Sequence, residues 1–258
     1  MPRPTLTYGQ YLKVPELLSL QDCLSSPLHH DEPLFIIIHQ VYELWFKLLL
    51  HETDTAIKLL NADRTSEATR LLRRVVEVQR LLVHQVRILE TMRPQDFLGF
   101  RYHLNPASGF QSIQFRELEF LLGLKDREVL ASLYSDAREK ARLEARLAAP
   151  SLGDAVDSLL ARRGFSTTEP EWRLDALTRI YEEADAYADL NALCEVLIEI
   201  DECLALWRAH HVQMVERMIG AKRGTGGSEG VGYLRSTLTK RAFPDLWHVR
   251  SRLGQEPG

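Results

Sequence analysis

The stretch LNALCEVLIEIDECLALWRAHHVQMVERMIGAK, residues 190–222, decides the fold class because apolar residues recur in it at every third or fourth position. That spacing places them on one face of an α-helix. The face consists of Leu193, Leu197, Ile200, Leu204, Trp207, His211, Met214 and Met218. At roughly 1.5 Å per residue this helix would be about 50 Å long, so we expect it to be the central helix of a bundle.

The same period runs through most of the remaining chain, and no segment shows the convincing alternation of a β-strand. Further helices are predicted over residues 34–60, 66–92, 109–125, 154–163 and 172–187. Residues 139–171 are rich in Ala and Arg, and we expect them to form a peripheral helical excursion. No linker is long or polar enough to divide the chain. The sequence therefore predicts an all-α fold over residues 1–258, a single-domain helical bundle around a long central helix.

The composition excludes several classes of protein. Lys and Arg number 32 against 36 Asp and Glu, and 45% of the residues are hydrophobic, which is typical of a soluble globular chain. Local basic clusters are accompanied by carboxylates, so no nucleic-acid partner is expected. No apolar run approaches the ~20 residues of a membrane span, and the first residues lack a signal-peptide core, so we expect no membrane association and a cytoplasmic location. Cys23, Cys194 and Cys203 form no CxxC pair, which favours neither a disulfide framework nor a zinc site.

Two histidines lie on apolar helix faces in distant parts of the sequence. His211 belongs to the long face described above, and His39 belongs to a second one. The second face consists of Phe35, His39, Tyr42, Phe46 and Leu49. A core-facing imidazole needs a partner for each ring nitrogen, because an unsatisfied buried polar atom costs roughly 1–3 kcal/mol. The partner is either a neighbouring carbonyl or carboxylate, or a metal or bound ligand.

Several cofactors are compatible with two such histidines, and the sequence separates some of them. A carboxylate-bridged di-iron bundle uses Glu-x-x-His motifs, and none of the nine histidines has Glu three residues before it. An iron site of two histidines and one carboxylate, with Glu43 one turn after His39, remains open. Walls rich in Phe, Trp, Met and Leu favour a large flat apolar cofactor, such as haem bound between helices and held by one histidine with the other facing its open side.

A glycine-rich segment follows the long helix directly. Residues 224–232, GTGGSEGVG, contain five glycines, but no GK[ST] motif and no preceding strand, so a nucleotide site is not expected. The segment is either a plain flexible connection or a loop whose backbone approaches a ligand closely. The glycine-rich segment begins only about three to four helical turns after His211, at the end of the same helix, which links it to a possible site.

Motifs along the whole chain resemble those of the tryptophan 2,3-dioxygenase family. The stretch HHDEPLFIIIHQ, residues 29–40, and ELWFK, residues 43–47, carry the strongest similarity. The other matching motifs, in the family's order, are TYGQYL (7–12), NPASGFQS (105–112), GAKRGTGGS (220–228), YLRST (233–237) and FPDLW (243–247). Two positions depart from the family pattern: Pro15 and Val41 stand where Asp and Thr or Ser are common. We expect these to affect packing more than chemistry.

The resemblance implies a role for individual residues. His211 would be the proximal haem ligand, and His39 the distal histidine that hydrogen-bonds the indole nitrogen. Phe35 and Phe97, by default core aromatics, would wall the indole pocket. Arg101 would bind the substrate carboxylate, and Ser108 would lie at the haem edge. Thr225 would lie in the glycine loop that closes over the amino-acid head group. Tyr8, Tyr11 and Leu12 would contact the pocket of a neighbouring subunit.

The resemblance also implies the activity. The family uses haem b, ferrous in the active state and one per subunit, to open the indole ring of L-tryptophan with O2. The product is N-formylkynurenine, in the first step of tryptophan degradation by the kynurenine pathway. A homotetramer with exchanged N-terminal segments, residues 1–30, is implied as well. Two alternatives stay open: a related monooxygenase acting on a tryptophan-like substrate in secondary metabolism, and a haem-binding sensor without turnover.

Overall fold

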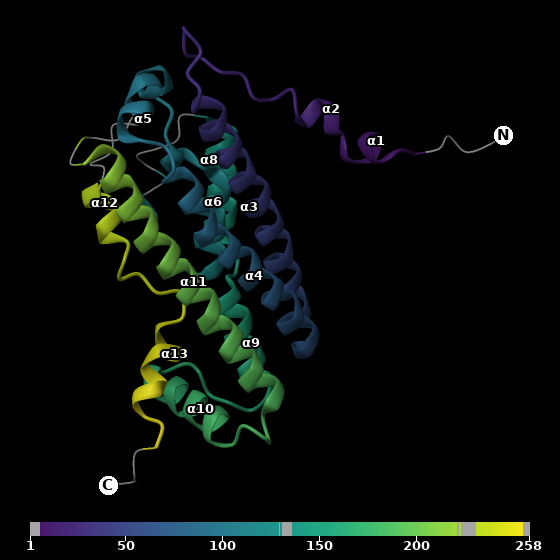
Figure 1. Ribbon diagram of the computed structural model, residues 1–258. Helices are drawn as coiled ribbons and strands as arrows, with labels where there is room; N and C mark the ends of the chain where they lie inside the picture. The colour runs from purple at the N-terminus through teal and green to yellow at the C-terminus, as the bar shows by residue number, and fades with distance from the viewer. Residues whose placement is uncertain (1–5, 129, 131–135, 221, 223–230, 255–258) are drawn as a thin grey trace, which may run out of the picture.

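The computed structural model describes residues 6–128, 130, 136–220, 222 and 231–254, and every regular element within these ranges is helical. The predicted all-α fold class is therefore confirmed (Figure 1). The α-helices are α1 (Tyr8–Leu12), α2 (Val14–Leu17), α3 (Glu32–Asn61), α4 (Thr65–Leu89), α5 (Pro94–Phe100), α6 (Ile113–Leu122), α8 (Ala137–Ala148), α9 (Leu152–Arg162), α10 (Pro170–Glu182), α11 (Ala188–Ile219), α12 (Val231–Ser236) and α13 (Pro244–His248). The 3₁₀ segments are η1 (Arg101–Leu104), η2 (Gly109–Gln111) and η3 (Val249–Ser251).

Three long helices form the centre of the molecule. α4 packs against both α11 and α3, while α6 and α9 pack against α3. The predicted long helix is confirmed as α11, which spans 32 residues. It ends at Ile219 and does not continue to residue 222, because Gly220 has a φ of 59°, a conformation that glycine adopts without the strain of a Cβ atom.

Several predicted helix boundaries are wrong: the helix expected over residues 172–187 is α10 and ends at Glu182, and two others differ for clear local reasons. The helix expected over residues 109–125 is divided into η2 and α6, because Ser112 is extended (φ −63°, ψ 107°) and its hydroxyl caps α6 by accepting from the Phe115 N–H. The helix expected to reach residue 92 ends at Leu89. Arg93 precedes Pro94 and has the extended conformation (ψ 150°) that a following proline favours.

The core is one continuous apolar cluster that draws on α3, α4, α6, α9, α10 and α11. Residues 139–171, expected as a peripheral excursion, include most of α8 and all of α9. α8 packs against α6 and α9 packs against α3. Leu143, Leu152 and Leu159 have no exposed surface, so this segment contributes buried side chains to the bundle.

Within the described residues, α3 is the one helix long and apolar enough to cross a membrane by length and composition alone. A core helix can pass the same test. Leu49, Ala56 and Leu60 of α3 are completely buried against the neighbouring helices. α3 thus turns one face to the interior of the bundle, and 28% of its most apolar stretch is buried.

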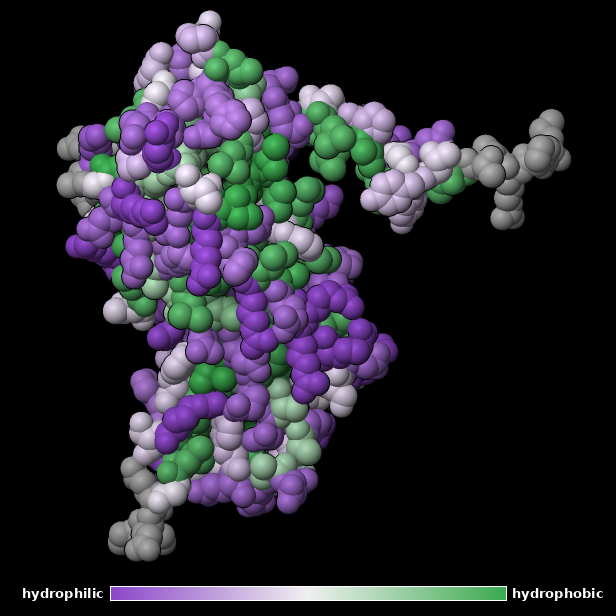
Figure 2. Space-filling view, viewed as in Figure 1, coloured by the Kyte–Doolittle hydropathy of each residue, from purple (hydrophilic) through white to green (hydrophobic). Residues whose placement is uncertain are grey.

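The N-terminal arm, residues 6–20, projects away from this body (Figure 1). It carries α1, whose first turn is closed by a capping box between Thr7 and Gln10, and the short α2. The arm joins the body where the Gln40 amide donates to the Leu20 carbonyl at 2.9 Å. Its apolar side chains face solvent in the single chain, as the green patches on the projecting segment of Figure 2 show.

The C-terminal segment is tied to the middle of α11 by one buried carboxylate. Asp201, 1% exposed, accepts hydrogen bonds from the backbone N–H of Ala242 at 2.9 Å and of Phe243 at 3.3 Å, and from Trp247 Nε1 at 2.9 Å. These bonds fix residues 242–247 against the same helix that carries His211.

Candidate functional site

A cavity of about 250 Å³ lies among α3, α4, α5, α6, α11 and α12. Its walls are mostly aromatic and aliphatic. The structure brings together on it six residues that the sequence singled out: Phe35, His39, Phe97, Arg101, Ser108 and His211. These residues come from segments that are far apart in the sequence, from Phe35 to His211, so the packing of the helices brings the site together.

His211 enters the cavity from α11. Its imidazole stacks on Trp207, with ring centroids 5.0 Å apart and an interplanar angle of 7°. Burial lowers the pKa of His211 to about 4, and the nearby His39 acts in the same direction. The ring is therefore neutral at physiological pH, and it forms no hydrogen bond with any described residue.

His39 reaches the same cavity from α3. Its Nδ1 lies 2.7 Å from the carbonyl oxygen of Phe35. Because a carbonyl only accepts, Nδ1 carries the proton and Nε2 of the neutral ring is left as an acceptor. Burial lowers the pKa of His39 below its ordinary value of 6.5, opposed by the bond to Phe35 and by Glu43.

Aromatic rings form one end of the cavity. Phe35 of α3 contacts the His39 ring at a centroid distance of 4.1 Å and stacks with Phe97 of α5 at 5.6 Å. Phe100, completely buried, packs edge-on against both phenylalanines. This arrangement gives a flat, apolar ligand two aromatic surfaces beside an imidazole acceptor.

Arg101 and Ser108 lie on the connection from α5 to α6. Arg101 begins η1, one turn after Phe97, and lines the cavity. Ser108 begins η2, where its hydroxyl accepts from the Phe110 N–H at 3.4 Å and its own N–H donates to the Gln111 side chain. A polar head group attached to a flat apolar ligand would meet these side chains.

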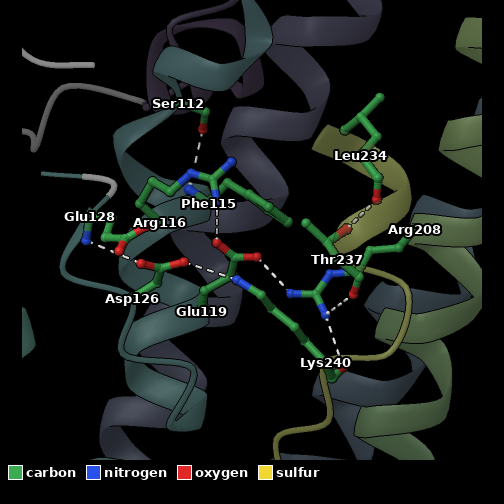
Figure 3. A network of polar contacts seen from close by, with 10 residues as sticks. All are labelled: Ser112, Phe115, Arg116, Glu119, Asp126, Glu128, Arg208, Leu234, Thr237 and Lys240. Atoms are coloured by element: carbon green, nitrogen blue, oxygen red, sulfur yellow. Dashed lines mark hydrogen bonds and ion pairs between the residues drawn. The ribbon is translucent and has the colours of Figure 1, made fainter. Parts of the chain in front are cut away.

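A buried ionic cluster on the cavity wall escaped the sequence analysis. Glu119 of α6 is held between Arg116, on the same helix, and Arg208 of α11 (Figure 3). Arg208 stands three residues before His211. The sequence offered one signal, the spacing of Arg116 and Glu119 on a helix face that is otherwise apolar. It could not show that Arg208 pairs with Glu119, because the two residues are 89 positions apart.

Three other singled-out residues do not line the cavity of this chain. Tyr8, Tyr11 and Leu12 belong to the arm and are 77%, 71% and 44% exposed. Thr225 lies outside the described residues.

The residues present fit a haem. His211 offers a neutral nitrogen with no competing hydrogen bond in the described chain, which is the form that binds iron. Within the described ranges no three His, Cys, Asp or Glu side chains converge as metal ligands, and the Glu43 carboxylate accepts from the Gln114 amide at 2.8 Å. An iron site of two histidines and the Glu43 carboxylate is therefore not supported among the described residues, whereas a porphyrin that supplies its own nitrogens needs only the imidazole.

The described residues define a helical bundle with an aromatic cavity that is lined by two neutral histidines. The sequence model described as Tryptophan 2,3-dioxygenase matches residues 2–164 and 154–253. The chain belongs to the tryptophan 2,3-dioxygenase family, and the family and enzyme class expected from its motifs are confirmed.

Curated relatives match over nearly their whole length. The Tryptophan 2,3-dioxygenase of Nocardioides sp. is 51% identical, covering 96% of this chain and 95% of its own. That of Myxococcus xanthus is 43% identical over 97% of this chain and 91% of its own. That of Xanthomonas oryzae pv. oryzae is 45% identical over 96% and 88%.

Proposed function

We propose that this chain opens the indole ring of L-tryptophan with dioxygen to give N-formylkynurenine, the first step of the kynurenine pathway, and that its cavity holds haem b through His211. The observation that carries the proposal is the His211 imidazole: enclosed, neutral and without a hydrogen-bond partner in the described chain, on the same cavity as the free acceptor of His39. A ferrous haem bound there, one per subunit, supplies the centre at which dioxygen is activated.

His39 orients the substrate. Its Nε2 is already an acceptor because Nδ1 is engaged by the Phe35 carbonyl, so it receives the indole N–H without changing its own protonation. The residue therefore positions the ring and need not remove a proton from it. Phe35 and Phe97 hold the faces of the indole and exclude water from the reacting bond.

The amino-acid head group meets the polar side of the cavity. Arg101 binds the carboxylate as a bidentate fork, which a lysine could not reproduce, and Ser108 lies beside the cofactor edge. Thr225, in the glycine-rich segment outside the described residues, is proposed to bind the head group as that segment closes over it. Thr225→Ala would then weaken binding of L-tryptophan more than Thr225→Ser, which keeps the hydroxyl.

The arm is proposed to complete the site of another subunit in a homotetramer. Tyr8 and Tyr11 are large, apolar and largely exposed here, which is unfavourable unless another surface covers them. Further exposed apolar side chains, available for subunit packing, are Ile37, Leu44, Leu81, Ile88 and Leu206. Ile37 and Leu44 lie on the outward face of α3, where a neighbouring subunit would cover them, and we propose that the enzyme works free of membranes, in the cytoplasm.

One experiment tests the reaction and its two alternatives. The reduced, haem-loaded protein is incubated with L-tryptophan under ¹⁸O₂, and the product is analysed by mass spectrometry. We expect N-formylkynurenine carrying both labelled oxygens. A product with one labelled oxygen would indicate a monooxygenase, and haem binding without product would indicate a sensor.

A further inference from the structure

The ionic cluster at Glu119 is enclosed and faces the cavity. Arg116, Glu119 and Arg208 are 6%, 7% and 4% exposed, and all three line the cavity. Glu119 Oε2 accepts from Arg116 Nη1 at 2.5 Å, and Glu119 Oε1 accepts from Arg208 Nη2 at 2.6 Å. Both carboxylate oxygens are therefore engaged by guanidinium groups (Figure 3).

The cluster has an excess of positive charge. A single carboxylate faces two guanidiniums, which leaves one buried positive charge without a counter-charge inside the cluster. The neighbouring Asp126 is close enough to interact electrostatically with Arg116, but its direct ion pair is with Lys240 at 2.9 Å, so these two further charges leave the excess of one positive charge unchanged. An unpaired buried charge is strongly unfavourable, so an anion arriving from the cavity would be stabilised here.

The two arginines differ in their free donors. Arg208 also donates through Nη1 to the carbonyl oxygens of Thr237 at 3.3 Å and Lys240 at 3.1 Å, so it is fixed by three partners. Arg116 uses only Nη1. Its Nε is buried without a hydrogen-bond partner, and no described residue bonds its Nη2. Nε and Nη2 form the edge of a guanidinium that binds a carboxylate through two parallel hydrogen bonds.

We infer that Arg116, held in place by Glu119 and Arg208, is a second carboxylate-binding subsite of the cavity, separate from Arg101. The inference rests on the proposed function for what fills the cavity. Two sources supply a carboxylate there: a propionate of the haem, or the amino-acid substrate. The position favours the propionate, because a chain of contacts links Arg116 to the proposed haem ligand His211. The Arg116 guanidinium lies 5.3 Å from the centre of the Phe115 ring, Phe115 lies 5.0 Å from Trp207, and Trp207 stacks on His211 at 5.0 Å.

The test compares haem with haem dimethyl ester, in which both propionates are neutral. The holoprotein is prepared with each porphyrin, and its transfer to excess apomyoglobin is timed for wild type, Arg116→Met and Arg116→Lys. Arg142→Met is the matched control. Arg142 of α8 pairs at 2.5 Å with the buried Glu117, which is on α6 like Arg116, but Arg142 does not line the cavity. Binding of L-tryptophan and of tryptamine, which lacks the carboxylate, is measured on each haem-loaded protein.

We expect Arg116→Met to release haem about tenfold faster or more, the usual size of losing a buried charge-assisted pair, while release of the dimethyl ester is unchanged. Arg116→Lys should release haem at an intermediate rate, and Arg142→Met should behave as wild type. Unchanged haem release, with weaker binding of L-tryptophan but not of tryptamine, would place the substrate carboxylate at the subsite.

The inference is overturned if Arg116→Met and Arg116→Lys alter neither comparison. If Arg116→Met does not fold, two other measurements decide: the ratio of the release rates of haem and its dimethyl ester from the wild type, and the substrate binding of Arg116→Lys. The inference is overturned if the wild type releases both porphyrins at the same rate and Arg116→Lys binds L-tryptophan and tryptamine as the wild type does. Failure of the proposed function looks different: the wild-type protein would either bind neither porphyrin at His211 or bind haem without giving the doubly labelled product, and neither result depends on Arg116.

Discussion

Glu119→Gln is expected to destabilise the haem-free protein by about 3–5 kcal/mol, because it leaves the guanidiniums of Arg116 and Arg208 buried without their shared counter-charge. Gln has nearly the same size and keeps one acceptor oxygen, but its NH2 group would face a guanidinium donor. The predicted loss is a large fraction of the ~5–15 kcal/mol by which a folded domain is stable.

Glu52→Gln is the matched control for this loss. Glu52 is also buried, at 8% side-chain exposure, but its partner Arg74 is 49% exposed and pairs with it at 2.6 Å. Arg74 can return to water when the carboxylate is lost, so the cost should be about 1 kcal/mol. Urea unfolding followed by circular dichroism measures both variants, with the slope of the transition checked for constancy. A Glu119→Gln variant no less stable than Glu52→Gln would refute the reasoning.

Four further predictions concern the site. His211→Ala should remain folded but lose most of its haem or its normal axial ligation; an unchanged absorption spectrum would place the ligand elsewhere. Arg101→Ala should raise the apparent KM for L-tryptophan roughly tenfold or more, and should impair binding of indolepropionate more than that of tryptamine; equal effects would remove Arg101 from the carboxylate role. Deleting residues 1–12 should lower kcat/KM while haem stays bound, and a fully active truncated protein would contradict the exchanged arm. Because burial lowers the pKa of His39, its ring stays neutral down to and below the ordinary value of 6.5, so KM should be flat from neutral pH to 6.5 and rise only at lower pH. The stability contributed by neutral His39 should fall below pH 6.5 too, since the unfolded chain takes up the proton first. His39→Phe should lack the KM effect and show a smaller loss of stability, because buried His211 contributes a loss of the same sign.

The sequence predicted the helices whose apolar faces are long and regular. α11 was predicted within three residues at each end, because a period of three and four maintained from Leu193 to Met218 is hard to mistake. The break between η2 and α6 was missed because Ser112 is a common helix-interior residue as well as a cap. Its extended conformation depends on the packing of the neighbouring segment.

The candidate site was predictable in part for a physical reason. His39, Phe35 and His211 stand on apolar helix faces, so their direction toward a core followed from spacing. The Arg116, Glu119 and Arg208 cluster did not follow, because charged residues are ordinarily assigned to solvent, and burial of this group depends on a contact between helices far apart in sequence. Arg101 and Ser108 were named through the resemblance to the family, since periodicity alone would have left both on a loop.

The projecting arm has a practical consequence for handling the enzyme. α1 lies beyond the cavity end of the bundle, whereas α13 and η3 lie beside α10 at the opposite end (Figure 1). If the arm enters a neighbouring copy, an affinity tag or fluorescent protein fused before Leu6 is carried toward that copy's pocket. The same fusion placed after Gly254 follows η3, which packs beside α10 and α13, close to a segment that Asp201 already anchors. Surface immobilisation through the end near Gly254 should therefore preserve turnover, and immobilisation through the arm should abolish it.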